Sequence, residues 1–133
     1  MSIDPVFDPY MVETKVYSDG ETIIEEGSTG SWIYVIVEGS VKVKKRTARK
    51  MVTLDTLKEG EVFGEMVFLE GGEGARSASV IAAEGPVRVA LLDTEKLIRE
   101  YEAVPAELRA LIRSFMIKLR NTTSKVCSIV VAR

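Results

Sequence analysis

The sequence of 133 residues contains no histidine and only one cysteine, Cys127. Without histidine the chain lacks the commonest metal ligand and general base, and a single cysteine cannot form an internal disulfide. The first nine residues are acidic and contain two prolines, unlike a signal peptide, and no apolar run is long enough to cross a bilayer. We therefore expect a cytoplasmic protein that is not an enzyme, holds no metal or cofactor and does not associate with membranes.

Basic residues are almost absent from residues 55–74, which hold six acids and Lys58 as their only base. A phosphate cannot be drawn there by a diffuse positive field, so an anion site in this stretch must rely on local groups.

By contrast, residues 42–50 hold six bases and no acid. Valines alternate with lysines at 41–44, and no aromatic side chain is interleaved, as a stacking surface for nucleic acid would need. We therefore interpret the basic run as a solvated face and expect no direct nucleic-acid binding.

Short β-rich runs punctuated by glycine fill residues 13–93. Regular strands of this kind predict an antiparallel β-roll or jelly roll of about eight strands. Residues 1–12 combine prolines with aromatics and predict an arm or short helix packed on the domain. With helices expected over residues 94–133, the fold class is mainly β with flanking helices (α+β), in one domain of residues 1–133. The expected strands include Thr14–Tyr17, Thr22–Ile24, Trp32–Val37, Val41–Lys44, Thr53–Leu57, Ala78–Ala83 and Val87–Leu92.

Two helices are predicted in the C-terminal part of the sequence. Asp93 or Thr94 can cap a first helix that runs through Tyr101, and Pro105 opens a longer second one. In the longer helix, mostly apolar residues recur at alternating steps of four and three, a heptad seam over about 33 Å at 1.5 Å per residue. Such a seam predicts a homodimer through this helix. It consists of Leu108, Ile112, Phe115, Leu119, Thr122, Val126 and Ile129.

The residues that carry chemistry lie in the stretch Phe63–Ser79. Gly64 lets the backbone approach a ligand, and the apolar run Met66–Leu69 predicts one helical turn whose free N–H groups would face an anion. Glu65 can accept hydrogen bonds from a sugar hydroxyl, while Arg76 offers a donor fork to phosphate oxygens. Together these groups can hold a cyclic phosphate and its sugar.

The alternative for this stretch is a surface loop without a ligand. Glu65 would then be a favourable charge at a helix N-terminus and Arg76 its ion-pair partner. Such a loop does not require the small residues Gly64, Ser77 and Ala78, which leave room for a ligand and, at Ser77, add a hydroxyl. We therefore favour the ligand site.

The sequence Phe-Gly-Glu at 63–65, an apolar turn, a small loop and Arg-Ser-Ala at 76–78 resemble the phosphate-binding cassette of cyclic nucleotide-binding domains. This family includes the bacterial catabolite activator protein, the regulatory subunits of cAMP-dependent protein kinase and the cyclic-nucleotide-gated channels. The resemblance covers nearly the whole chain and implies a cyclic purine nucleotide as ligand, with cAMP the first candidate. The ligand-binding residues that it implies here are Phe63, Gly64, Glu65, Met66, Arg76, Ser77 and Ala78.

Thr122 is the single polar break in the seam, and Thr123 follows it. In the bacterial activators of this family, the corresponding helix carries a Thr-Ser pair before Lys-Val and contacts the purine from both subunits. The resemblance therefore implies Thr122 and Thr123 as further ligand residues. Threonine at the second position keeps a hydroxyl but adds a methyl, so the choice between cAMP and cGMP stays open. The alternative is a tolerated polar residue, or one that sets the register of the helix pair.

The first hypothesis for the function is a sensor or regulatory module, in which a cyclic nucleotide changes the position or pairing of the C-terminal helix. A second is the sensor portion of a transcription regulator of the catabolite-activator type. Such regulators carry a helix-turn-helix after the long helix, and this sequence stops at Arg133. A third is a scaffold of the same fold that has lost its ligand. An enzyme has the least support, because catalytic β-rolls of the cupin type use histidine clusters.

Overall fold

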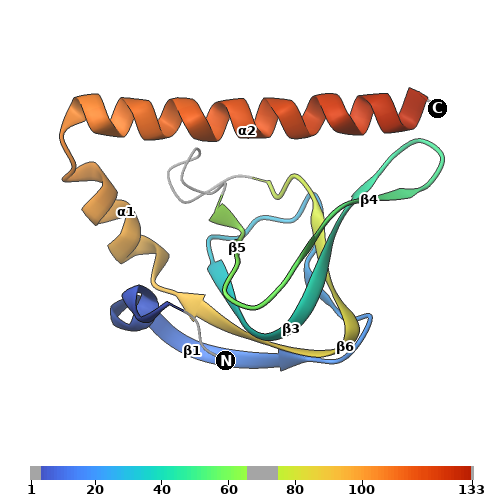
Figure 1. The fold of residues 1–133 in the computed structure, drawn as a ribbon, viewed down its shortest axis with the longest axis horizontal. Coiled ribbons are helices and arrows are strands. Elements are labelled where there is room, and N and C mark those ends of the chain that lie inside the picture. The colour runs from blue at the N-terminus through green and yellow to red at the C-terminus, as the bar shows by residue number, and fades with distance from the viewer. Residues whose placement is uncertain (1–3, 66–74, 133) are drawn as a thin grey trace.

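The computed structural model describes residues 4–65 and 75–132 and is built on one antiparallel sheet of six strands (Figure 1). A 3₁₀ helix precedes the sheet, and two α-helices follow it. The class expected from the sequence, mainly β with flanking helices, is thereby confirmed. The elements are η1 (Pro5–Tyr10), β1 (Met11–Tyr17), β2 (Thr22–Ile24), β3 (Ile33–Arg46), β4 (Met51–Leu57), β5 (Val62–Phe63), β6 (Ser79–Leu92), α1 (Thr94–Glu102) and α2 (Ala106–Ala132).

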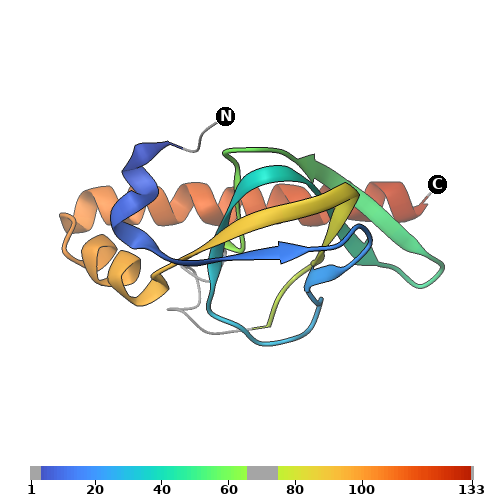
Figure 2. The same cartoon turned by 90° about the horizontal axis from the view of Figure 1, so that it is seen from below.

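The sheet has the order β1-β6-β3-β4, with β2 also pairing with β6 and β5 with β3. β1 and β6 run side by side, and α2 lies on the opposite side of the molecule from β1 (Figures 1 and 2). β3 and β6 are each 14 residues long and are paired along nearly their whole length. The sheet is therefore organised by two long, bent strands at its centre.

The number of strands differs from the expected eight because two expected strand pairs are single bent strands. All of the expected strand Trp32–Val37 except Trp32 itself, and all of Val41–Lys44, belong to β3, where the register shifts between Ile36 and Ser40. Such irregularities bend a strand without ending its pairing. At the bend, Gly39 has a φ of +91°, and a Cβ there would lie 2.7 Å from the carbonyl oxygen of Pro86. Ala78–Ala83 and Val87–Leu92 are joined in the same way within β6.

The core lies on both faces of the sheet because successive side chains of a strand point to opposite sides. In β3, Tyr34 and Ile36 belong to a cluster inside the curved sheet, together with Phe63. Ile33 and Val35 belong to a second cluster, against which side chains of η1 and α1 pack. Because both faces of this part of β3 are buried, its apolar residues form a continuous run in the sequence. Packing against Ile33 and Val35 holds η1 and α1 on the outer face of the sheet.

Polar contacts also hold η1 against α1. The hydroxyl of Tyr10 donates to the carboxylate of Glu100, and the ammonium of Lys96 lies 5.0 Å from the centre of the Tyr10 ring. Lys96 Nζ also donates to the carbonyl of Pro9 at 3.3 Å. The side chain of Asp93 caps α1 by accepting a hydrogen bond from the Lys96 backbone N–H at 3.0 Å. Asp93 is one of the two capping residues that the sequence predicts.

The corner between α1 and α2 is fixed by hydrogen bonds. The hydroxyl of Tyr101 donates to the carbonyl of Arg109 at 2.9 Å. Arg109 Nη1 donates in turn to the carbonyls of Glu102 at 2.5 Å and Val104 at 3.3 Å. The bonds from Arg109 satisfy the carbonyl of Glu102 at the end of α1 and that of Val104 between the helices. Together with the bond from Tyr101, they hold the angle between the two helices.

α2 contacts β4 and leaves an apolar stripe in solvent. The exposed fractions of the stripe residues are 49% for Leu108, 50% for Leu111, 59% for Phe115 and 57% for Leu119. Ile112, which the heptad pattern places in the same seam, is half-buried. No helix in the described part of the chain is long and apolar enough to span a membrane.

Candidate functional site

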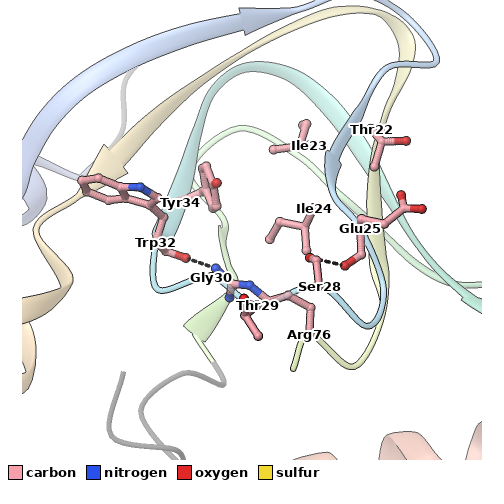
Figure 3. A pocket seen from close by; sticks show the side chains of 10 residues that line it. All are labelled: Thr22, Ile23, Ile24, Glu25, Ser28, Thr29, Gly30, Trp32, Tyr34 and Arg76. Carbon is pink, nitrogen blue, oxygen red and sulfur yellow. Dashed lines mark hydrogen bonds between the residues drawn. The ribbon is translucent and has the colours of Figure 1, made fainter. Parts of the chain in front are cut away.

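Arg76 is held at the site by both its side chain and its backbone. Its guanidinium donates from Nη1 to the carbonyl of Gly64 at 3.2 Å and from Nη2 to the carbonyl of Trp32 at 2.8 Å. Its backbone N–H donates to Ser28 and its carbonyl accepts from Gly27, each at 2.8 Å. Figure 3 shows the Trp32 carbonyl directed at Arg76, while the indole points away. The guanidinium is therefore fixed in direction before any ligand arrives.

Two glycines leave the space that the guanidinium occupies. Gly64 has a φ of +81°, and a Cβ there would lie 2.9 Å from the Trp32 carbonyl oxygen and 3.3 Å from Arg76 Nη1. A Cβ on Gly30 would lie 3.2 Å from Arg76 Nη2. The sequence pointed to Gly64 as a site residue but did not distinguish Gly30 from the other glycines between the strands.

Glu65 lies half-buried and is electrostatically coupled to Arg76. Burial raises the pKa of the Glu65 carboxyl, and a backbone hydrogen bond and the charge of Arg76 oppose that rise. Burial likewise lowers the pKa of the Arg76 guanidinium, against the influence of Tyr34 and Glu65. The guanidinium nevertheless stays charged at every relevant pH. The charges of Glu65 and Arg76 thus influence each other, in partly buried surroundings that strengthen hydrogen bonds to both.

A cavity of about 470 Å³ opens beside Arg76 (Figure 3). This volume falls in the range of roughly 300–1,000 Å³ that is typical of small-molecule sites. Among the described residues, its walls combine aliphatic and aromatic side chains with hydroxyl groups and one carboxylate, and Arg76 is the only predicted ligand residue in this part of the lining. The lining residues are Thr22, Ile23, Ile24, Glu25, Ser28, Thr29, Gly30, Trp32, Tyr34 and Arg76.

The other predicted cassette residues differ in their surroundings. Phe63 is buried, and its ring stacks on Tyr34 with the ring centres 4.9 Å apart, so its side chain belongs to the core and anchors the backbone that leads into Gly64. Ser77 is exposed and Ala78 is half-buried. Met66 and the expected helical turn Met66–Leu69 lie outside the described residues.

The two threonines predicted to contact the base are both on α2. Thr122 is exposed and does not line the cavity. The side chain of Thr123 lies outside the described part of the structure. Their role as ligand residues therefore stays a prediction.

Among residues 4–65 and 75–132, no group of three or more histidine, cysteine, aspartate or glutamate side chains is arranged to hold a metal ion. The charged groups of the site are Arg76 and Glu65. A guanidinium and a carboxylate are suited to binding and orienting a small anion that carries hydroxyl groups.

The model of the cyclic nucleotide-binding domain family matches residues 14–103. The chain belongs to this family. It is 35% identical over 86 residues to human cGMP-dependent protein kinase 2, a match that covers 63% of this chain and 11% of the kinase. It is also 35% identical over 103 residues to the cyclic AMP receptor protein of Thermus thermophilus, covering 75% of this chain and 47% of that protein.

A solved structure gives the same assignment. The EAL enzyme Bd1971 in its cAMP- and cyclic-di-GMP-bound form superposes with a TM-score of 0.77 and 26% identity, over 89% of this chain and 31% of that chain. The present chain thus spans about a third of this enzyme and about half of the Thermus protein. These proteins share one domain with this chain and contain further parts that it does not match.

Replacing Gly64 by alanine is expected to destabilise the protein more than the same change at Gly60. Both glycines have a positive φ, +81° and +86°, which costs a non-glycine residue about 1–2 kcal/mol. The new methyl group at position 64 would also clash with the Trp32 carbonyl oxygen, whereas a methyl group at position 60 would have no atom within 4 Å. Overpacking of this kind adds about 1 kcal/mol or more. Chemical denaturation of both variants measures the difference, and equal losses would contradict the close approach at Gly64.

Proposed function

We propose that this domain binds a cyclic nucleoside monophosphate, with cAMP the first candidate. Arg76 pairs with the cyclic phosphate, and Glu65 accepts a hydrogen bond from the ribose hydroxyl. The observation that supports this proposal is a half-buried, pre-oriented guanidinium coupled to a half-buried carboxylate, beside a cavity of suitable volume. Membership of the cyclic nucleotide-binding family adds the ligand class.

The phosphate site depends on the donors that Arg76 has left. A guanidinium has five N–H donors, and two of them serve the carbonyls of Gly64 and Trp32. The remaining donors are available for phosphate oxygens, and the two carbonyls fix their direction. Because Arg76 is half-buried, its attraction for an anion is screened less than at an exposed position. Local groups thus replace the diffuse positive field that the acidic stretch around the site lacks.

The sugar site depends on the carboxylate of Glu65. A carboxylate has only acceptor sites, which matches the donor capacity of a ribose hydroxyl. Burial raises the pKa of Glu65, which means that its charged form is poorly solvated in the absence of a ligand. A hydroxyl that donates to this carboxylate replaces part of the missing solvation, so the contact favours a ligand that retains its 2′-hydroxyl.

The choice of base is the least constrained part of the proposal. The relatives include one protein named for cGMP and another named for cyclic AMP, at the same identity of 35%. Our preference for cAMP rests on Thr122 and Thr123, whose place before Ser124-Lys125-Val126 resembles that of the purine-contacting pair in bacterial activators. Titration with both nucleotides tests this preference.

The proposed output is a change in the position or pairing of α2. The hydrogen-bonded corner at Arg109 couples α2 to α1, and α1 is tied to η1 through Tyr10. A ligand that binds one arrangement of these helices better than another shifts the population toward it. The exposed stripe from Leu108 to Leu119 gives α2 a surface for pairing with a second copy. The domain thus acts as a regulatory module and not as a catalyst.

A second candidate is a sensor portion within a longer regulator. The observation in its favour is that the chain covers only part of each relative, about half of the Thermus receptor protein and about a third of the EAL enzyme. Nucleotide binding is common to both candidates. They differ in the segment that receives the signal, which is a paired α2 in the first and an attached domain in the second.

Cyclic AMP is expected to raise the melting temperature of the protein by about 10 °C at a concentration about 100 times its dissociation constant. At this ratio, a ligand that binds only the folded state stabilises that state by roughly 2.7 kcal/mol. For a domain of this size, such a gain raises the melting temperature by about 10 °C. Thermal unfolding with cAMP, cGMP and the non-cyclic 5′-AMP measures the effect. The absence of any shift with either cyclic nucleotide at millimolar concentration would leave a ligand-free scaffold as the better description.

A further inference from the structure

Lys45 belongs to the basic run that the sequence assigns to a solvated face, but the structure gives its side chain a different place. Its ammonium lies 3.2 Å from Glu26 Oε2 and donates to the carbonyl of Ser77 at 2.7 Å. The side chains of Lys45 and Glu26 are only 33% and 27% exposed. Lys45 therefore bridges β3 to the residue that directly follows Arg76.

Glu26 joins the same cluster through two further contacts. Its Oε1 accepts from the backbone N–H of Arg46 at 2.9 Å, and its own N–H donates to Ser79 Oγ at 2.9 Å. Ser79 is buried, at 6% exposure. Burial pushes the pKa of the Glu26 carboxyl upward, but the hydrogen bonds that the carboxylate accepts from the Arg46 N–H and the Lys45 ammonium, together with the charges of Lys45 and Arg46, outweigh burial, and the net shift of the pKa is downward. The carboxylate is thus stabilised in its charged form.

The residues after Glu26 run directly along the backbone of Arg76. Gly27 N–H donates to the Arg76 carbonyl, and Arg76 N–H donates to the Ser28 carbonyl, each at 2.8 Å. We propose that Lys45 and Glu26 form a latch that positions the Arg76 backbone, so that the guanidinium meets the phosphate in the correct place. The inference rests on the proposed function and adds two positioning residues to it, neither of which contacts the ligand.

A role in positioning explains this cluster better than a role in stability. Ion pairs that are partly exposed contribute little to the free energy of unfolding, about 0–1 kcal/mol. The pair of Arg88 and Glu38 shows the ordinary case, with N···O at 3.5 Å and side-chain exposures of 48% and 64%. The Lys45 ammonium, by contrast, contacts both a carboxylate and a backbone carbonyl next to Arg76. Charge-assisted contacts with a defined geometry hold neighbouring groups within the tolerance that a binding site needs.

The test compares Lys45→Met with Lys44→Met. Both changes remove one positive charge from the same strand, and among the described residues the Lys44 ammonium makes no hydrogen bond or ion pair. Calorimetric titration with cAMP is expected to show about tenfold weaker binding for Lys45→Met, with a melting temperature within a few degrees of the parent, and unchanged binding for Lys44→Met. Lys45→Arg, which keeps a cationic donor, is expected to retain most of the parent's affinity. Equal affinity in Lys45→Met and the parent, or equal losses in both methionine variants, would overturn the proposal.

Glu26→Gln completes the test as part of a double-mutant cycle. Because Lys45 and Glu26 contact each other within one cluster, the double variant is expected to lose less affinity than the sum of the two single losses, whereas additive losses would show that the two residues act separately. Hydrogen exchange of the Gly27 and Arg76 amides in the ligand-free protein gives a readout that is independent of binding. It is expected to be about tenfold faster in Lys45→Met and unchanged in Lys44→Met. If the parent binds neither cAMP nor cGMP, the proposed function fails, and the exchange data decide the latch alone: equal exchange in parent and Lys45→Met overturns it.

Discussion

Replacing Arg76 by alanine is expected to weaken cAMP binding by about 2–5 kcal/mol, the usual effect of truncating one partner of a desolvated charge pair. The structure adds a reason for a large loss. The guanidinium is half-buried and already directed by the carbonyls of Gly64 and Trp32, so little reorganisation is needed when the phosphate binds. Isothermal titration of parent and variant with cAMP measures the difference.

Two companion variants sharpen this experiment. Arg76→Lys keeps the charge but loses the two-pronged donor geometry, so it is expected to recover only part of the affinity. Arg88→Ala removes an exposed arginine on β6 that does not line the cavity, and it is expected to leave binding unchanged. The melting temperature of each ligand-free variant reports separately on the loss of the contacts with Gly64 and Trp32. Undiminished binding by Arg76→Ala would move the phosphate site elsewhere in the molecule.

Replacing Phe115 by glutamate is expected to abolish pairing of two chains through α2. Phe115 is 59% exposed and lies at the middle of the apolar stripe from Leu108 to Leu119. In a parallel pair the new carboxylate would face its own copy, which combines desolvation with repulsion between like charges. If Thr122 and Thr123 reach the base only in the paired state, the same variant also weakens cAMP binding, by a coupling energy of about 1–3 kcal/mol. Analytical ultracentrifugation with and without cAMP measures the pairing.

Ala110→Glu is the matched control for this variant. Position 110 is also exposed on α2, but by helical geometry it lies well away from the stripe, and the change adds the same charge in a residue that favours helices. It is expected to leave pairing and cAMP binding unchanged. A parent that sediments as a monomer in both states would contradict the dimer and would confine the response to a movement of α2 within one chain.

Much of the local structure was predictable because it is set by neighbouring residues. The cap at Asp93 depends on a side chain and an N–H three residues apart, and the apolar pattern of the strands follows the period of the sheet. The cassette was also predictable in part. Gly64 was singled out as a position for a small residue, and the close approach of Trp32 requires one there, whereas the roles of Arg76 and Glu65 in binding a ligand stay predictions.

The remaining features depend on contacts between distant parts of the chain. A glycine such as Gly39 marks a bend within a strand as readily as a turn between two strands, and only the pairing with β6 distinguishes them. Lys45 resembles its basic neighbours in the sequence, but its partners Glu26 and Ser77 lie 19 and 32 residues away. Charge patterns within a window of ten residues therefore could not identify the latch, and the same limit applies to Gly30 beside Arg76.

The pairing of β1 with the second half of β6 bears on how the chain folds. Met11 lies opposite Leu92 and Tyr17 opposite Val87, so the first strand completes its hydrogen bonds only with the last one. Closing the loop between residues 17 and 87 costs chain entropy before any contact compensates for that cost. Folds dominated by such non-local pairs form slowly, on the order of milliseconds to seconds. During synthesis β1 has no partner until residue 92 has left the ribosome. Until then both edges of this segment lack a partner, whereas in the folded sheet only one does, and an unpaired edge with apolar residues such as Val12 and Val16 is a template for pairing with another chain.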